Sequence, residues 1–310
     1  MFRWLVNVGL LVLPIAVTLG ILLGLQSSRS SSGQSPLFSP PIDNKWVEKM
    51  FCQKSFGIHP ETKGQQYTLN PNQWAWQVGD PGFLCMNVTT LNNQTYPSKT
   101  MAPQFKVFWQ YPQRDSDQPV HAFPNIKIDG GALPAVLQKI NAIKVDMAWS
   151  MRLDNKTDTA TDVDELLQAN VNSNVAIDMF LDRDKSKAQD SEEAKFEVMV
   201  WFAAIGPATF AIGQQDGAVS KKSIDGTDFD LFFGQNGRGQ NVLTWKSKTA
   251  AHDFHGDIGP LVAEILQSNR DNFPSASDYL GYLSFGSEAY HSNKPVTFSV
   301  PSLSIDIQKS

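Results

Sequence analysis

A strict two-residue alternation over residues 143–153 restricts this part of the chain to an extended strand. Successive side chains of a strand point to opposite faces of its sheet, so one face of this segment is buried and the other meets solvent or ligand. Polar and charged residues take most of the second face, which leaves the first face for the core. The residues expected in the core are Ile143, Val145, Met147, Trp149, Met151 and Leu153.

Several further segments alternate in the same way, and turn signals separate them. Residues 175–180 and 296–307 are two of these, and the second changes its period at Pro301. Asp-Gly pairs such as Asp225-Gly226 are typical of hairpin turns. The pattern predicts an all-β antiparallel sandwich with one substantial helix at 258–266, where apolar residues recur at helical spacing.

Length and charge narrow the classes of function. The 310 residues, 41% of them hydrophobic, suffice for one sizeable core, and all-β domains of this length are commonly undivided. The net charge is −5, and Lys and Arg form no dense stripe in the sequence. Both observations argue against a nucleic-acid partner. Neither a phosphate-binding glycine loop nor a Gly-x-Ser-x-Gly motif occurs. We expect one domain that acts as a monomer.

The amino terminus is a separate feature, because residues 4–25 are largely apolar and long enough to span a bilayer as a helix. A retained signal anchor over 1–25 is favoured over a cleaved signal peptide, since the residues after Gly24 are a poor cleavage site. Residues 26–44 are rich in Ser, Gly and Pro, which predicts a flexible linker. The folded domain is then expected at 45–310.

Both interpretations of the amino terminus direct the chain into the secretory route. Cys52 and Cys85 are the only cysteines, and such a pair is expected to form a disulfide in an oxidising compartment, with two buried free thiols as the alternative. Asn-x-Thr sequons at Asn87, Asn93 and Asn155 are candidate glycosylation sites. We predict an extracellular protein, either secreted or anchored in the membrane by its amino terminus.

Two alternating runs each place a glutamate on a polar strand face. Glu197, Met199 and Trp201 share one face of the first run, and Glu288 lies in the second run, over residues 282–290. A single glutamate on a strand face is most often ordinary surface. Met199 and Trp201 would expose much apolar area on a solvated face, whereas a cleft that stacks sugar rings explains them. Two glutamates on such faces indicate glycoside hydrolysis.

Two motifs around these glutamates, Glu-Val-Met-Val-Trp at 197–201 and Phe-Gly-Ser-Glu at 285–288, carry a family resemblance. The first is similar to the nucleophile strand of glycoside hydrolase family 12, and the second is similar to its acid/base motif. Segments 67–74 and 174–178 follow in the order of that family. The resemblance covers the chain from about Cys52 to its carboxyl terminus.

The resemblance implies a β-jelly roll of two antiparallel sheets, with a concave cleft for β-1,4-glucan or xyloglucan and hydrolysis with net retention. It implies that Glu197 is the nucleophile, Glu288 the general acid/base and Asp178 the carboxyl partner of the nucleophile. Retention places the two catalytic carboxyl groups about 5 to 5.5 Å apart. No metal and no organic cofactor is implied, and a β-glucan polysaccharide is the expected partner.

Aromatic side chains are expected to form the sugar subsites, because sugar rings stack their apolar faces on indoles. Trp74 and Trp201 are the first candidates, with Asn72 and Met199 beside them. Trp109 is a further candidate, although a Trp at its position lies in a core at least as often.

The chain departs from the family pattern where substrate preference is decided. Ser55 stands where the family often has an aromatic residue, unless Phe56 substitutes for it, and Phe210-Ala211-Ile212-Gly213 stands in place of a Pro-Ile-Gly segment. Two alternatives stay open from the sequence: a jelly roll that binds carbohydrate without hydrolysis, and a transglycosylase that uses the same site.

Three polar segments are assigned no chemistry. Residues 252–257 contain two His but are expected to be a polar loop that precedes the helix, not a metal site. Residues 182–185 are expected to form a solvated turn and not a calcium loop. Residues 158–167 fit a short helix or a disordered loop equally well.

Overall fold

The chain divides into two units, Met1–Asn44 and Lys45–Ser310, which are described individually. The computed structural model describes residues 2–31, 45–114, 119–154, 160–268 and 270–310. The first unit holds helix α1 (Phe2–Ser31), which continues past the predicted boundary at residue 25. Within the described part of the chain, no helix is both long and apolar enough to cross a membrane. Residues 32–44 of the predicted linker lie outside the described residues.

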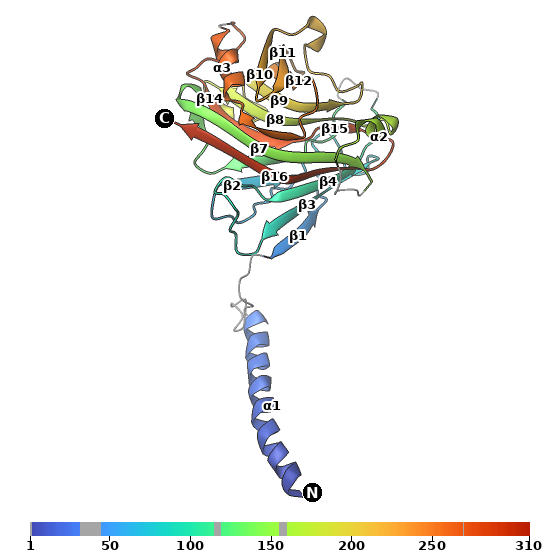
Figure 1. Cartoon of the computed structure of the whole chain (residues 1–310), viewed down its shortest axis with the longest axis vertical. Helices are drawn as coiled ribbons and strands as arrows, with labels where there is room; N and C mark the ends of the chain where they lie inside the picture. The colour runs from blue at the N-terminus through green and yellow to red at the C-terminus, as the bar shows by residue number, and fades with distance from the viewer. Residues whose placement is uncertain (1, 32–44, 115–118, 155–159, 269) are drawn as a thin grey trace. The chain divides into compact units, whose positions relative to one another are not determined.

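The second unit consists mainly of two stacked β-sheets (Figure 1). The six-stranded sheet has the order β1 (Trp46–Phe51), β3 (Phe83–Leu91), β4 (Gln104–Gln110), β16 (Val296–Lys309), β7 (Ile140–Leu153) and β13 (Asp253–Asp257). The ten-stranded sheet has the order β10 (Ser220–Ile224), β11 (Thr227–Gln235), β12 (Asn241–Ser247), β9 (Phe196–Ile205), β8 (Asn172–Asp182), β14 (Tyr279–Gly286), β5 (Asn125–Asp129) and β2 (Gln66–Asn70). In addition, β15 (Ala289–His291) pairs with β8 and β6 (Ala135–Val136) pairs with β14.

These sheets confirm the predicted all-β sandwich, and among the strands described one pair is not antiparallel. Strands β9 and β12 run parallel, because β10 and β11 intervene in the chain and bring β12 back beside β9 in the same direction. The short helices are α2 (Val163–Gln168) and α3 (Gly259–Gln267), with single 3₁₀ turns at η1 (Leu137–Lys139), η2 (Lys187–Gln189) and η3 (Gln214–Asp216).

One apolar core fills the space between the two sheets. All the alternating residues of β7 that were expected in the core are buried there, Trp149 included. From the opposite sheet, Val198, Val200 and Phe202 of β9 join the same core. Because side chains alternate along a strand, this fixes Glu197 and the residues in phase with it on the other face of the ten-stranded sheet. We call that face the site face.

Two further strands and the helix that the sequence located are confirmed. The strand at 175–180 is confirmed within β8, and the strand at 296–307 within β16, where the pairing register with β7 shifts between Ser299 and Ser302, as expected at Pro301. The predicted helix is α3, which has its proline in the first turn.

Residues 252–257 were predicted wrongly as a polar loop. Residues Asp253–Asp257 form edge strand β13, which pairs with β7. The reason is Phe254, which is buried in the core with its ring centroid 5.0 Å from that of Phe202, while the polar neighbours point outward. Burial of this one aromatic side chain therefore holds the polar segment at the edge of the sheet.

Local hydrogen bonds determine the structure of the other two polar segments, 158–167 and 182–185. Of residues 158–167, those from 163 onward lie in α2, where the Asp162 carboxylate accepts from the Glu165 N–H at 3.0 Å and caps the helix. The turn after β8 is solvent-exposed as predicted, except that Asp182 is buried. Its carboxylate accepts from the N–H groups of Asp184 and Lys195 at 2.7 and 2.9 Å.

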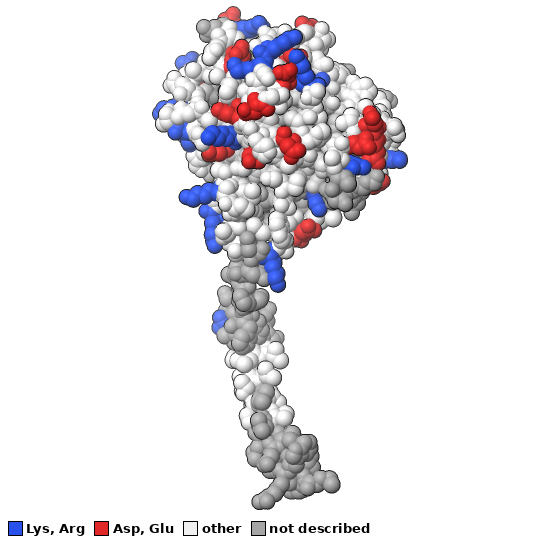
Figure 2. Space-filling model, in the orientation of Figure 1, with Lys and Arg blue, Asp and Glu red and all other residues white. Residues whose placement is uncertain are grey.

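Lys, Arg, Asp and Glu side chains of the second unit are interspersed on the face drawn in Figure 2. Two of the three sequons lie on described residues. Asn87 is a partly buried residue of β3 that donates to Glu48 at 3.3 Å, and Asn93 lies in the turn that follows, where it accepts from the Thr95 N–H at 2.9 Å. The sequon at Asn155 lies outside the described residues. Glycosylation of these sites stays a prediction.

Cys52 and Cys85 form a disulfide, which confirms the predicted pair and rules out two free thiols. The bond joins the segment after β1 to β3 across 33 positions of sequence.

Replacing both cysteines by serine is expected to lower the free energy of unfolding by about 3 to 4 kcal/mol, because the bond restricts the unfolded chain. Urea unfolding of the oxidised wild type and of the Cys52→Ser/Cys85→Ser variant measures this difference. Wild type unfolded under reducing conditions is the control and should match the variant. Equal stability of oxidised and reduced protein would contradict the prediction.

Candidate active site

Three carboxyl groups that are distant in sequence meet on the site face. Strands β8 and β9 pair with Asp178 opposite Met199 and with Phe180 opposite Glu197, so both acidic residues lie on the same face. Glu288 lies in the two-residue gap between β14 and β15, both of which pair with β8. The central strand β8 therefore has one glutamate on each side.

Asn174 of β8 holds Glu288 in place. Its side-chain amide donates to Glu288 Oε2, and its amide oxygen accepts from the Glu288 backbone N–H at 2.9 Å. The Tyr290 hydroxyl donates to the same Oε2 atom at 3.3 Å. These contacts fix the backbone and the carboxyl group of Glu288 together.

Glu197 is held from the opposite direction by the turn between β11 and β12. The Asn236 amide donates to Glu197 Oε2 at 3.3 Å, and Asn236 is itself fixed by a 2.9 Å hydrogen bond to Gln240. Both glutamates keep part of their surface in solvent, whereas Asp178 is only 6% exposed. Asp178 Oδ1 is buried without a hydrogen-bond partner among the described residues.

Burial raises the pKa of all three carboxyl groups, and the charge of neighbouring carboxylates adds to this for Asp178 and Glu288. Burial followed by the charges of Glu197 and Glu288 raises the pKa of Asp178 well above its usual range. Burial raises the pKa of Glu197 to about 7, against the Asn236 hydrogen bond and the nearby Arg238 charge. Burial and the charge of Glu197 raise the pKa of Glu288 to about 7. Such a set retains protons near neutral pH and can present an acid beside a carboxylate.

The predicted sugar-binding residues separate into exposed and buried ones. Trp74 is 40% exposed in the loop after β2, and Asn72 precedes it in a left-handed backbone conformation. Trp201 and Met199 lie on the site face as expected, but Trp201 is only 3% exposed, and its indole N–H donates to the Met199 sulfur at 3.3 Å. Trp109 does not reach the site face, because it points into the core from β4.

Trp201 is buried among residues of neighbouring strands and of the segment after β9. It belongs to a small apolar cluster, separate from the main core, to which Ala211 contributes from the segment after β9. No signal in the sequence predicted this cluster, because a strand pattern does not show which segments pack against the strand. Asn236 was missed for a similar reason, since its contact with Glu197 depends on the parallel pairing of β9 with β12.

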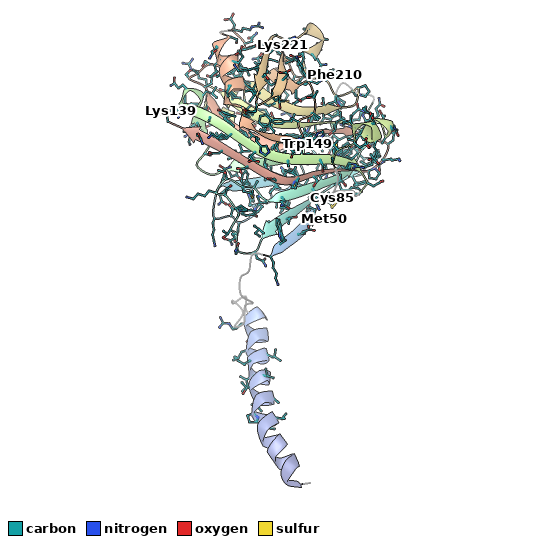
Figure 3. The ribbon with its side chains drawn as sticks, in the orientation of Figure 1. Met50, Cys85, Lys139, Trp149, Phe210 and Lys221 are labelled. Atoms are coloured by element: carbon teal, nitrogen blue, oxygen red, sulfur yellow. A yellow bond between two sulfur atoms is a disulfide. The ribbon has the colours of Figure 1, made fainter. Side chains whose placement is uncertain are left out.

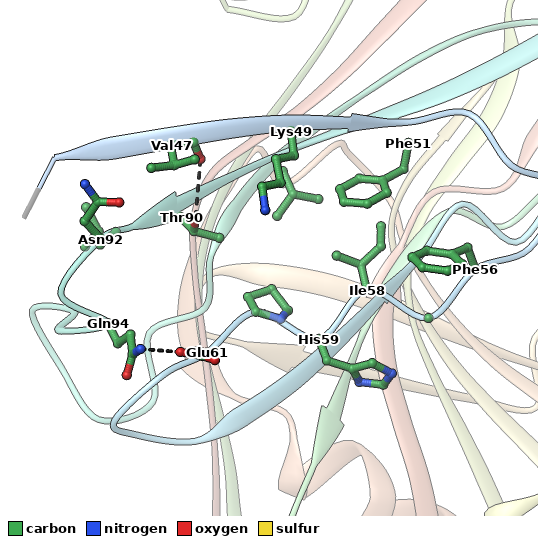
Figure 4. Close-up of a pocket in the computed structure, with 14 residues that line it drawn as sticks. Val47, Lys49, Phe51, Phe56, Ile58, His59, Glu61, Thr90, Asn92 and Gln94 are labelled. Atoms are coloured by element: carbon green, nitrogen blue, oxygen red, sulfur yellow. Dashed lines mark hydrogen bonds between the residues drawn. The ribbon is translucent and has the colours of Figure 1, made fainter. Parts of the chain in front are cut away.

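A pocket of about 540 Å³ lies away from the carboxyl groups, between β1, β3 and the segment before β2 (Figure 4). Its apolar wall includes Phe51 and Phe56, whose rings stack with centroids 5.9 Å apart. Its polar wall includes Lys49, His59 and Glu61. None of the three site carboxyl groups lines it. No group of three or more His, Cys, Asp or Glu side chains suited to a metal ion occurs among the described residues.

Comparison with known proteins agrees with this architecture. The 32% identical probable xyloglucan-specific endo-beta-1,4-glucanase A of Aspergillus clavatus matches over 190 residues, which are 60% of this chain and 65% of that protein. The xyloglucan-specific endo-beta-1,4-glucanase A of Aspergillus niger is 30% identical over 38% of this chain and 45% of its own length. The chain thus spans less than two thirds of these relatives.

Solved structures share the fold. Endoglucanase 3 of Trichoderma harzianum, from family GH12, superposes with a TM-score of 0.64 at 21% identity, over 84% of this chain and 98% of that one. A family 12 xyloglucanase from Bacillus licheniformis superposes with a TM-score of 0.61 at 16% identity, over 84% and 100%. The predicted jelly roll is confirmed. The family model for glycosyl hydrolase family 12 matches residues 65–308, which is most of the chain, and the chain therefore belongs to that family.

Proposed function

We propose that this protein is a retaining endo-β-1,4-glucanase that cleaves β-1,4-glucan or xyloglucan. The observation that carries the proposal is the group of three carboxyl side chains on the site face, Asp178, Glu197 and Glu288, whose pKa values are all raised. Retaining hydrolysis needs one carboxylate to attack and one carboxylic acid to protonate the leaving oxygen. The names of the Aspergillus relatives support a glucan or xyloglucan as substrate.

In the first step, Glu197 attacks the anomeric carbon and the glycosidic C–O bond breaks. The leaving oxygen takes its proton from Glu288, so that a glycosyl-enzyme ester and a shortened glycan result. The ester carries no charge, which removes the repulsion that raised the pKa of Glu288. Glu288 can then remain ionised and act as the base for the second step.

In the second step, water attacks the anomeric carbon, its proton passes to Glu288, and Glu197 leaves as a carboxylate. Two inversions give net retention. Asp178 is assigned to hold a proton beside Glu197, because its buried carboxyl group is the least able to carry a charge. Trp74, with Asn72 beside it, is assigned to stack a sugar ring, since Trp74 exposes a large part of its indole.

The proposal is tested by a reducing-sugar assay on xyloglucan, carboxymethyl cellulose and mixed-linkage glucan. We expect activity on at least one of them, with the β-anomer as the first product seen by proton NMR. Activity on none would contradict the proposal. Calorimetric binding of glucan oligosaccharides without turnover would favour the carbohydrate-binding alternative.

We further propose that the domain acts as a monomer outside the cell, since all three carboxyl groups come from one chain and a disulfide suits an oxidising compartment. If residues 1–25 form a retained anchor, the mature protein isolated from membranes should keep them. Amino-terminal sequencing measures this directly. A mature start between residues 27 and 45 would show instead that the segment is a cleaved signal peptide.

A further inference from the structure

The segment 206–213, which follows β9, is fixed at both ends, and we call it the Phe210 loop. Gly206 and Gly213 have positive φ angles of 84° and 78°. A Cβ atom at either position would collide with a backbone carbonyl, that of Val171 or that of Phe233. Both ends of the loop therefore need glycine, because each packs closely against a neighbouring backbone segment.

Hydrogen bonds hold the interior of the loop as well. The Ala208 N–H donates to the side-chain oxygen of Asn172 at 2.7 Å, and the Thr209 hydroxyl donates to the Ile205 carbonyl at 2.7 Å. Ala211 belongs to the small apolar cluster in which Trp201 is buried. The loop is thus fixed at both ends and in its interior.

The same loop presents a different aromatic ring to solvent. Phe210 is 59% exposed, and Ile212 beside it is also exposed. Figure 3 labels Phe210 at the end of the domain away from Met50 and Cys85. A ring held on a pinned backbone loses little entropy when a ligand stacks on it, so Phe210 is suited to binding.

Polar groups lie beside Ala211, the residue of the loop that follows Phe210. Gln214 Oε1 accepts from the Ala211 N–H at 3.1 Å and from Lys246 Nζ at 3.0 Å. Lys246 pairs in register with Asp230 of β11, and Asp230 Oδ1 is a buried atom with no hydrogen-bond partner among the described residues. An aromatic face bordered by hydrogen-bonding groups matches the two sides of a sugar ring.

The Phe210 loop and the acid Glu288 are held by nearby residues of β8. Asn172, which holds the loop, and Asn174, which holds Glu288, are two residues apart on β8, or roughly 7 Å along the strand. The three carboxyl groups lie on or beside the adjacent strands β14, β8 and β9. On one side of these strands, the sheet ends at β2, which the Trp74 loop follows. On the other side lies β11, on which the Gly213 end of the Phe210 loop packs. The leaving sugar must lie next to the acid that protonates it.

We propose that Phe210, with Gln214, Lys246 and Asp230 beside it, forms a subsite for the sugar residue on the leaving-group side of the cleaved bond. This inference rests on the function proposed above. The same subsite receives an acceptor sugar in the second step: the acceptor O–H oxygen bonds to the anomeric carbon, the ester bond to Glu197 breaks, and the proton passes to Glu288.

The test compares two substrates of the Phe210→Ala variant. One is the glycan that the wild type cleaves, and the other is the nitrophenyl glycoside of an oligosaccharide from that glycan, whose leaving group is not a sugar. We expect kcat/KM to fall on the order of tenfold for the glycan and by less than about twofold for release of nitrophenol. Longer products made by transfer to added oligosaccharide should decrease by a similar factor, and Phe210→Tyr should restore both.

Phe83→Ala is the matched control, because Phe83 is an exposed phenylalanine of β3 in the other sheet, and it should change neither rate. A Phe210→Ala variant that loses neither activity, or loses both equally, would overturn the subsite while leaving the proposed function intact. A wild type that cleaves neither substrate would overturn the proposed function, and the subsite with it.

Discussion

Replacing Glu197 by alanine is expected to reduce hydrolysis of the glycan by at least about 10⁴-fold, because the variant lacks the group that forms the covalent intermediate. The side chain is held by Asn236 on a strand whose other face lies in the core, so its removal changes the site more than the fold. The loss should appear in kcat, with thermal stability near that of the wild type. Steady-state kinetics and thermal unfolding together measure the effect.

Covalent trapping tests the identity of the nucleophile independently. A 2-fluoro-glycoside with a good leaving group slows the second step, so the wild type should gain the mass of one glycosyl group. Peptide mass spectrometry should locate that mass on Glu197. Glu264→Ala is the control, since Glu264 pairs with Lys222 on the exposed side of α3, and this variant should be labelled and active like the wild type. A label on any residue other than Glu197 would contradict the assignment.

Replacing Glu288 by alanine is expected to slow cleavage of the glycan by about 10² to 10⁴-fold, as loss of a general acid does. A nitrophenyl glycoside should lose much less in the first step, because its leaving group needs no proton. Added azide should restore turnover of this substrate by attacking the glycosyl-enzyme, since an anion needs no general base, and the product should be a β-glycosyl azide. A variant that azide does not accelerate would contradict the acid/base role.

The pH dependence of kcat/KM is a second test of the role of Glu288. Burial and the charge of Glu197 raise the pKa of Glu288 to about 7. An acid must be protonated to act, so wild-type kcat/KM on the glycan should fall as the pH rises through about 7. The residual activity of the Glu288→Ala variant should lack this alkaline limb. A limb that persists in the variant would assign it to another group.

The sequence alone determined which residues share a strand face. The alternation over β7 predicted its whole buried set, and the alternation around Glu197 predicted that Glu197, Met199 and Trp201 lie together. Hydrophobic period is a local property, because side chains alternate whatever lies opposite them. The disulfide was also predictable, since the chain offers only one pair of cysteines.

Only the tertiary structure decided what lies against each face. The same alternation describes Trp109, which points into the core, and Trp201, which is buried in a cluster with Ala211, so alternation alone did not separate core positions from sugar subsites. The partners of the carboxyl groups depend likewise on which strands become neighbours: Asn236 reaches Glu197 through the parallel pairing of β9 and β12. Strand order is set by packing between segments far apart in the chain, and a pattern of period two carries no information about it.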